Sequence, residues 1–540
     1  MRKIWLSRHV TWPRGERSGG FNRDVAQELT DAVLVMVYSL AIEATYNLRQ
    51  VDVNSFLGKA DVQQKAVKRR ASGNLAVARP DTGSASQRNR ELRLAQIILA
   101  AQETFREDGY AAFATRSVAG RVGITLGNLQ YYFRTKEELL RAALQAYVDQ
   151  IINDYTAIAN QAGTSAARRC SALVERIFFD INESDLPKFL FEVWAFAQHE
   201  SYAAELVGDM YVECRSNFAK LLSEIHPTLT HEECLARASV IVAQTAGMMI
   251  FAYNGGDSDK DYAEFVRVTK RSVKMMVDLL PQMLENEVTL RGLPNLNTYG
   301  TNVAHGGIFN SDKHAQQELF DLNMRQTGQE KLYYRPTVQG KRREVKINEI
   351  VSAAANLLAA EGYANFTLAR VARELGIPPS ALQNYFPTHD DLLRSTTSAL
   401  MKVYSDRYAE MGKPSGKPAL ERLCEIVVDA FKEAGDSRAR RFSFEIFALA
   451  QHSDITLELT RTLYSAYRAN YADLVRELDA SATARECHAR ATLIAAQIEG
   501  TMTLMFGSKK QPPDTDRIFE LMKAITIRVA HGNVATKSTT

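Results

Sequence analysis

The sequence predicts an all-α protein that contains two copies of one helical unit. The heptad GNLQYYF at residues 127–133 returns as SALQNYF at residues 380–386, and further stretches match at the same 253-residue shift. Apolar residues follow the spacing of amphipathic helices in both copies, and the alternation typical of strands is absent. A chain of 540 residues is long enough for several domains of this kind.

The repeat continues through each copy without a net insertion. GYAAFATRSVAGRVGI at residues 109–124 falls on GYANFTLARVARELGI at 362–377, and FEVWAFAQH at 191–199 falls on FEIFALAQH at 444–452. This period is too long for a solenoid, whose units have about 20–50 residues. We therefore expect a tandem duplication of a domain-sized unit.

The start of each unit predicts a helix-turn-helix. In the first copy a helix ends at Gly109, a short helix covers about 115–122, Gly123 breaks it, and a third helix runs over 125–133. Thr135 then begins a fourth helix, with a glutamate three residues later as in a capping box. A helix presented in this way fits the major groove of DNA.

These motifs resemble the DNA-binding domain of TetR-family transcriptional regulators. The pattern G-Y, V-A, G-I, L-x-x-Y-F and T-K-E-E-L-L, within residues 109–140, carries the resemblance. It implies that the remainder of each unit is a helical ligand-binding and dimerisation domain, and that the late helices near 236–253 and 490–506 form the interface between the units. Since such regulators usually work as dimers of single units, we expect an internal pseudo-dimer on one imperfect palindrome.

The expected organisation follows from the repeat and the motifs. Residues 71–89 and 286–342 are rich in polar and small residues, which predicts flexible segments. The apolar run at 32–42 is too short to span a bilayer and favours a short amphipathic or buried helix over a signal peptide. The expected segments are an N-terminal extension (1–85), helix-turn-helix domain 1 (86–145), helical regulatory domain 1 (146–285), a linker (286–342), helix-turn-helix domain 2 (343–398), helical regulatory domain 2 (399–530) and a disordered tail (531–540).

The third helix of the first copy and its flanks supply the candidate DNA contacts. Asn and Gln side chains pair with adenine edges, and the fourth helix offers a lysine and N-terminal amides to a phosphate. Arg116 matches a position that often contacts DNA in the resembled family. The candidates are Arg116, Thr125, Leu126, Gly127, Asn128, Gln130, Tyr131, Tyr132 and Lys136.

The second copy is expected to bind DNA more weakly or to read a different half-site. Ala369 replaces Arg116, and residues 339–399 carry seven Lys and Arg against six Asp and Glu, whereas residues 86–146 carry nine against six. Phosphate attraction supplies most non-specific affinity. The candidates in this copy are Arg370, Pro379, Ser380, Ala381, Gln383, Asn384, Tyr385 and His389. The copies also differ at Ala114, which lacks the capping hydroxyl of its counterpart Thr367.

Aromatic, Met and polar residues mark candidate effector pockets in the regulatory domains. Apolar residues at helical spacing are more typical of a plain core than of a pocket, and the pocket is kept as the alternative. A polar group beside an apolar pocket can orient a ligand. The candidates are Trp194, His199, Tyr211, Gln244 and Met248 in the first copy and Phe447, His452, Tyr464 and Gln497 in the second.

The sequence therefore favours a ligand-responsive repressor over an enzyme. No Gly-rich phosphate loop or G-x-S-x-G motif is present, and the five scattered cysteines form no C-x-x-C pair, so we expect no cofactor, no metal site and a cytoplasmic protein. The expected partners are a double-stranded DNA operator and a small-molecule effector, with no membrane, and pairing with a second tandem chain is left open. The alternative is a ligand-binding regulatory adaptor whose second unit has weak or lost DNA binding.

Overall fold

The computed structural model describes residues 85–254, 259–281, 283, 341–506 and 514–532. The predictions for the apolar run at 32–42, the body of the linker and the end of the tail lie outside these residues. The chain divides into two compact units, Met1–Ala95 and Gln96–Thr540. The second unit contains the whole second copy of the repeat and the first copy from Gln96 onwards.

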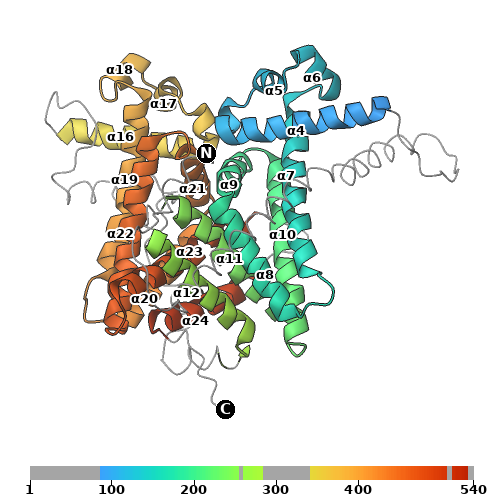
Figure 1. The fold of residues 1–540 in the computed structure, drawn as a ribbon. Coiled ribbons are helices and arrows are strands. Elements are labelled where there is room, and N and C mark those ends of the chain that lie inside the picture. Colours follow the sequence, from blue (N-terminus) through green and yellow to red (C-terminus); the bar gives the residue numbers. More distant parts are fainter. Residues whose placement is uncertain (1–84, 255–258, 282, 284–340, 507–513, 533–540) are drawn as a thin grey trace, which may run out of the picture. The chain divides into compact units, whose positions relative to one another are not determined.

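Every element of the described residues is helical, which confirms the all-α fold class, and the order of helices repeats (Figure 1). The first copy contains α4 (Ala85–Ala112), α5 (Thr115–Val122), α6 (Leu126–Tyr132), α7 (Lys136–Ala159), α8 (Ala166–Glu183), α9 (Leu186–Phe196), α10 (Ser201–Ile225), α11 (His231–Asn254) and α12 (Asp259–Asp278). The second contains α16 (Lys341–Glu361), η1 (Tyr363–Asn365), α17 (Leu368–Glu374), α18 (Pro379–Gln383), α19 (His389–Gly412), α20 (Ala419–Gly435), α21 (Ser437–Leu449), α22 (Asp454–Leu478), α23 (Ala484–Leu504) and α24 (Thr515–Ala530).

One local expectation is wrong at the start of the first copy. The sequence predicted a flexible segment through residue 89, but α4 begins at Ala85. The segment contains the good helix formers Gln87 and Arg88, which favour a helix over a flexible chain. In addition, the Gln87 side chain donates to the Glu91 carboxylate one turn later at 3.2 Å. The same helix breaks at Gly109, whose φ of 77° is not helical.

Short-range capping bonds set the boundaries of the helix-turn-helix helices. The Thr125 hydroxyl accepts from the Asn128 amide at 3.2 Å, and Thr135 accepts from Glu138 at 3.0 Å. Thr367 caps α17 in the second copy, whereas α5 has no side-chain cap at Ala114, as its sequence predicted. Each bond satisfies an amide that a helix start would otherwise leave unpaired.

The helix α11 is both long and strongly apolar. Its residues His231–Tyr253 are long and apolar enough to cross a membrane by length and composition, but 94% of the most apolar window is buried inside the protein. A helix that is apolar on all sides is typical of a core as well as of a membrane span. The burial identifies α11 as a core helix of this fold.

The two copies meet through α11 and α23, with α12 and α24 beside them (Figure 1). These are the late helices in which the family resemblance placed the interface. At the crossing, a Cβ on Gly247 would overlap the backbone carbonyl of Ala496, and a Cβ on Gly500 would overlap that of Ala243. The absence of side chains at these two glycines therefore lets the backbones of the two copies touch.

Buried amides stabilise the same crossing. The Gln244 side chain donates to the Gln497 side-chain oxygen at 3.3 Å and to Ser272 at 2.8 Å, and Gln497 donates to Thr526 at 2.6 Å. Both glutamines are almost fully buried. Because an unpaired buried amide is costly, these bonds favour one register of α11 on α23.

A larger residue at the helix crossing should separate the two copies. We expect Gly500→Val to lower the free energy of unfolding by about 3 kcal/mol, because the added methyl groups meet rigid backbone. Urea denaturation of the full chain measures the change. Gly120→Ala is the matched control, since nothing lies within 4 Å of a Cβ there, and it should be neutral or stabilising by up to about 1 kcal/mol. Equal stability of the Gly500 variant and the wild-type chain would contradict the close approach.

Candidate functional site

The third helix of the first copy presents a polar surface on an apolar anchor. Leu129 of α6 is fully buried, together with Val118 of α5, and the turn is closed by a bond from the Ile124 amide to the Ala119 carbonyl at 3.0 Å. This fixes the angle between α5 and α6. The remaining residues of α6 can then face away from the core.

The candidate DNA contacts of this copy divide into exposed and packed residues. Leu126 and Tyr132 are half-buried and pack against the core. Lys136 lies at the start of α7 with its ammonium 5.6 Å from the centre of the Phe113 ring. The exposed candidates are Arg116, Thr125, Gly127, Asn128, Gln130, Tyr131 and Lys136. Their exposure leaves them available to a groove or a phosphate.

In the second copy the basic candidates already have partners within the protein. Arg370 bonds to Glu361 at 3.0 Å and to Glu374 at 2.9 Å, which uses the guanidinium for ion pairs of α17. The His389 ring nitrogen lies 2.9 Å from the Phe366 carbonyl. The ion pairs of Arg370 lower the positive charge that this surface of the second copy presents.

The candidates on α18 and directly after it are divided between exposed and packed residues in the same way as those on α6. Pro379, Ser380, Gln383 and Asn384 are exposed, whereas Ala381 and Tyr385 are half-buried. The Tyr385 ring packs under the Arg343 guanidinium at 4.8 Å. The helix itself has five residues, Pro379–Gln383, against seven in α6. The third helix is thus shorter in the second copy than in the first.

A buried carboxylate network joins the two helix-turn-helices, and the sequence did not predict it. Glu445 of α21 accepts from the Tyr363 amide of its own copy at 2.8 Å and from the Tyr110 hydroxyl of the other copy at 2.9 Å. It also lies 2.7 Å from the His199 ring. Tyr110 follows Gly109, at the point where α4 turns towards α5, so this carboxylate contacts the beginning of both helix-turn-helices.

Glu192 of α9 makes the equivalent set of bonds with the roles of the two copies exchanged. It accepts from the Tyr110 amide at 2.8 Å, from the Tyr363 hydroxyl at 3.3 Å and from the His452 ring at 2.9 Å. Both carboxylates are fully buried. Burial raises the pKa of Glu192, and the hydrogen bond to Glu192 raises the pKa of His452. The two sets of bonds form one network with approximate two-fold symmetry.

Glycine is required where this network meets the helix-turn-helices. Gly109 and Gly362 both have a φ of 77°, and a Cβ on Gly109 would lie 2.8 Å from the His452 ring nitrogen. The signal in the sequence was a glutamate inside an apolar run of both copies, FEVWAF and FEIFAL. Its partners are far away along the chain, so the run alone could not name them.

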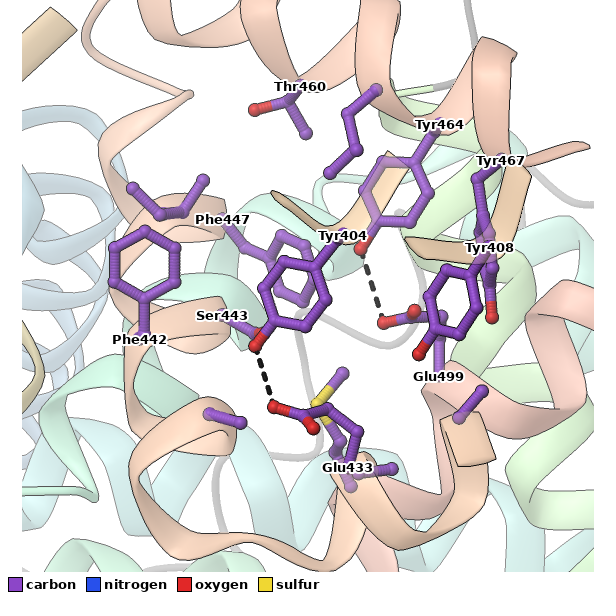
Figure 2. Close-up of a pocket in the computed structure, with 16 residues that line it drawn as sticks. Tyr404, Tyr408, Glu433, Phe442, Ser443, Phe447, Thr460, Tyr464, Tyr467 and Glu499 are labelled. Carbon is purple, nitrogen blue, oxygen red and sulfur yellow. Dashed lines mark hydrogen bonds between the residues drawn. The ribbon is translucent and has the colours of Figure 1, made fainter. Parts of the chain in front are cut away.

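Two cavities lie at equivalent places in the regulatory domains. The first-copy cavity has a volume of about 50 Å³, and the second-copy cavity has a volume of about 80 Å³ (Figure 2). Tyr211 lines the first, and its counterpart Tyr464 lines the second together with Phe447. These three were predicted as ligand-binding residues from the sequence.

The other predicted ligand-binding residues line neither of these two cavities. His199 and His452 belong to the carboxylate network, and Gln244 and Gln497 lie at the helix crossing. Trp194 and Met248 are fully buried in the core, where the Trp194 ring lies 5.4 Å from the Phe444 ring of the other copy. No group of three or more potential metal ligands occurs among the described residues.

The family model for bacterial regulatory proteins of the tetR family matches the chain twice, at residues 97–143 and 350–396. Both matches cover the helix-turn-helices described above. They have the same length and the same 253-residue spacing as the sequence repeat. The second match therefore reflects the duplication.

Characterised relatives are similar to one unit of this chain. The HTH-type transcriptional activator FasR of Mycolicibacterium smegmatis is 35% identical over 96 residues, which is 18% of this chain and 43% of FasR. The HTH-type transcriptional regulator BetI of Escherichia coli is 26% identical over 178 residues, 32% of this chain and 88% of that protein. BetI of Burkholderia ambifaria is 26% identical over 204 residues, 37% of this chain and 97% of that protein. The relatives, the two model matches and the repeated fold together identify the chain as a DNA-binding transcriptional regulator of the TetR family that carries the family's unit twice in tandem.

Proposed function

We propose that this chain is a ligand-responsive repressor whose two helix-turn-helices bind one imperfect palindrome as an intramolecular pseudo-dimer. The carboxylate network carries this proposal, because Glu192 and Glu445 each contact the start of both helix-turn-helices. A two-fold pair of helix-turn-helices reads half-sites about one helical turn apart, so the spacing between them decides operator affinity. The network is the group of contacts that would hold this spacing.

A route from the cavities to the DNA-binding helices supports the ligand response. Phe442, Ser443 and Phe447 of α21 line the second-copy cavity, and the same short helix carries Glu445 (Figure 2). In the first copy α9 lines the cavity with Leu186 and carries Glu192. An effector that displaces either helix would therefore change the bonds that hold both helix-turn-helices. Coupling between such sites is typically worth about 1–3 kcal/mol.

The adaptor remains the second candidate function, and one observation favours it. Arg370 is neutralised by Glu361 and Glu374, and α18 is short. In this proposal the second unit has weak or lost DNA binding, and the chain acts through protein contacts. We prefer the repressor because Pro379, Ser380, Gln383 and Asn384 remain exposed for base contacts in the second copy.

The division into helix-turn-helix and regulatory domains, as expected from the sequence, gives each unit one DNA-binding part and one effector-binding part. The protein would act in the bacterial cytoplasm, where the operator lies. Two tandem chains could also pair, which would bring four helix-turn-helices to one DNA site.

A footprint of the purified full chain on the DNA that flanks its coding region tests the proposal. Protection of one imperfect palindrome of ordinary dimer length, without effector and at low salt, is the expected result. A footprint twice as long would mean that two chains pair. Protection of a single half-site would favour the adaptor and contradict the pseudo-dimer.

Two substitutions in the first copy should separate base recognition from phosphate binding. Gln130→Ala should reduce the preference for the operator over random DNA by about tenfold, because a base contact is lost. Lys136→Ala should weaken binding to both DNAs alike and reduce the salt dependence, because a phosphate contact is lost. Fluorescence anisotropy at several salt concentrations measures both effects.

The matched control for Gln130→Ala is Gln145→Ala, an exposed glutamine on α7 that lies beyond the helices α5 and α6. It should leave both affinities unchanged. If Gln130→Ala and Lys136→Ala instead lower operator and random binding equally, the assignment of roles is wrong.

Loss of the Glu445 carboxylate should uncouple the two helix-turn-helices. The Glu445 carboxylate accepts from the Tyr363 amide and the Tyr110 hydroxyl and lies against the His199 ring nitrogen. In Glu445→Gln a side-chain NH₂ group, which can only donate, would face these donors. We expect affinity for the complete operator to fall about tenfold or more, with affinity for an isolated half-site unchanged.

Anisotropy titrations with complete and half-site duplexes measure this uncoupling, and circular dichroism checks that the variant is folded. Glu458→Gln, an exposed position on α22, is the matched control. A folded Glu445 variant that loses equal affinity for both duplexes would argue against a positioning role for the network.

A further inference from the structure

The two cavities occupy the same place in the repeat, so their linings can be compared position by position. Tyr155, Tyr211 and Met249 of the first lining become Tyr408, Tyr464 and Met502 of the second at the 253-residue shift. The shared frame consists of α7 to α11 in one copy and α19 to α23 in the other. Differences between the linings are therefore substitutions at matched sites.

One group of substitutions removes aliphatic bulk from the second cavity. Each of these positions lines the cavity in both copies, and each changes from a branched aliphatic residue to a small one. Such changes enlarge a cavity when the backbone is held by its neighbours. The pairs are Ile177 and Ala430, Ile181 and Ala434, Leu186 and Ala439, and Leu190 and Ser443.

A second group of substitutions makes the enlarged space polar and aromatic. The positions of an isoleucine, a cysteine and an alanine in the first lining carry two tyrosines and a glutamate in the second. A glutamate in place of a core alanine is costly unless it has a partner. The pairs are Ile151 and Tyr404, Cys214 and Tyr467, and Ala246 and Glu499.

The two carboxylates of the second cavity accept hydrogen bonds from tyrosines across it (Figure 2). The Tyr464 hydroxyl donates to Glu499 at 3.2 Å, and the Tyr404 hydroxyl donates to Glu433 at 2.9 Å. Burial raises the pKa of Glu499 to about 7. Tyrosine hydroxyls supply hydrogen bonds but no positive charge, so a cation bound beside Glu499 would favour its ionised form.

The two carboxylates of this cavity differ in their charged partners. Glu433 forms an ion pair with Arg407, which also pairs with Asp429. Among the described residues, no basic side chain forms an ion pair with Glu499. In the first copy the aligned position is Ala246, so that cavity has no such charge.

We propose that the cavity of the second copy binds a small organic cation, an ammonium group carried on an apolar body, and that the first-copy cavity does not. This deepens the proposed function by naming the effector class for one of the two sites. The ammonium would lie between Glu433 and Glu499, against the faces of the surrounding tyrosine rings. The apolar body would fill the space left by Ala430, Ala434 and Ala439.

Other ligand classes fit the lining less well. An anion would meet two carboxylates, and none of the described residues that line the cavity is basic. A bare metal ion would need several oxygen or nitrogen ligands, and the described residues hold no such cluster. Ring faces and carboxylates together favour an organic cation, because both the quadrupole of an aromatic ring and the acid attract positive charge while the ring also accepts apolar contact.

Titration calorimetry on the full chain without DNA tests this inference with shape-matched probes. The cations are benzylamine and phenyltrimethylammonium, and their uncharged counterparts are benzyl alcohol and tert-butylbenzene. We expect at least one cation to bind at one site per chain, about tenfold more tightly than its uncharged counterpart. Equal affinities within both pairs, or no binding of either cation, would overturn the proposal.

Substitution of Glu499 locates the site. Glu499→Gln keeps the shape and should abolish the preference for the cation while leaving the uncharged probe unaffected. Glu499→Ala installs the residue that the first copy already carries and should act in the same way. The exposed Glu458→Gln control should behave as the wild-type chain. A cation preference that survives both Glu499 substitutions would place the site elsewhere and contradict the inference.

The same probes added to the operator complex distinguish this inference from the proposed function. If a cation binds through Glu499 but does not release the DNA, the effector response of the proposed function fails and the site remains. If uncharged probes bind as well as cations and release the DNA, the response stands and the choice of a cation fails.

Discussion

The backbone contact between α11 and α23 is the constraint on which the arrangement of the two copies depends. Gly247 and Gly500 leave no room for a side chain, and Gln244 and Gln497 bond to each other across the crossing. The contact sets where each regulatory domain lies relative to the other. It thereby sets where α9 and α21 meet, and those two helices carry the carboxylates that bind the opposite helix-turn-helix.

The carboxylate network links both helix-turn-helix domains to that fixed interface through hydrogen bonds. Taking a carboxylate out of water costs several kcal/mol, and Glu192 and Glu445 recover this through an amide, a hydroxyl and an imidazole each. An apolar contact could supply similar stability, but it would tolerate sliding. Directional bonds to backbone amides next to Gly109 and Gly362 hold both helix-turn-helices at one distance and angle. A small movement of α21 is then transmitted to both.

The parts of this molecule that could be predicted from its sequence are those that depend on near neighbours or on the repeat. Thr125 and Thr135 cap helices through amides three residues away, and the constant shift identified the duplication. The network could not be predicted, because Glu445 bonds to Tyr110 over 335 residues of chain. The predicted roles of His199 and His452 rested on their place beside apolar runs. Only the fold decides whether such a histidine faces a cavity or a carboxylate.

Covalent linkage explains why the two cavities can differ. In a dimer of identical chains every substitution appears twice, so a buried acid at the cavity would carry its desolvation cost in both subunits. Here Glu499 faces one cavity while Ala246 keeps the other apolar. The first copy keeps an apolar cavity, while the second carries the buried acid and the larger space. The helix-turn-helices have diverged in the same way, since Arg370 of the second copy forms ion pairs within the protein and the first copy has a serine at that position.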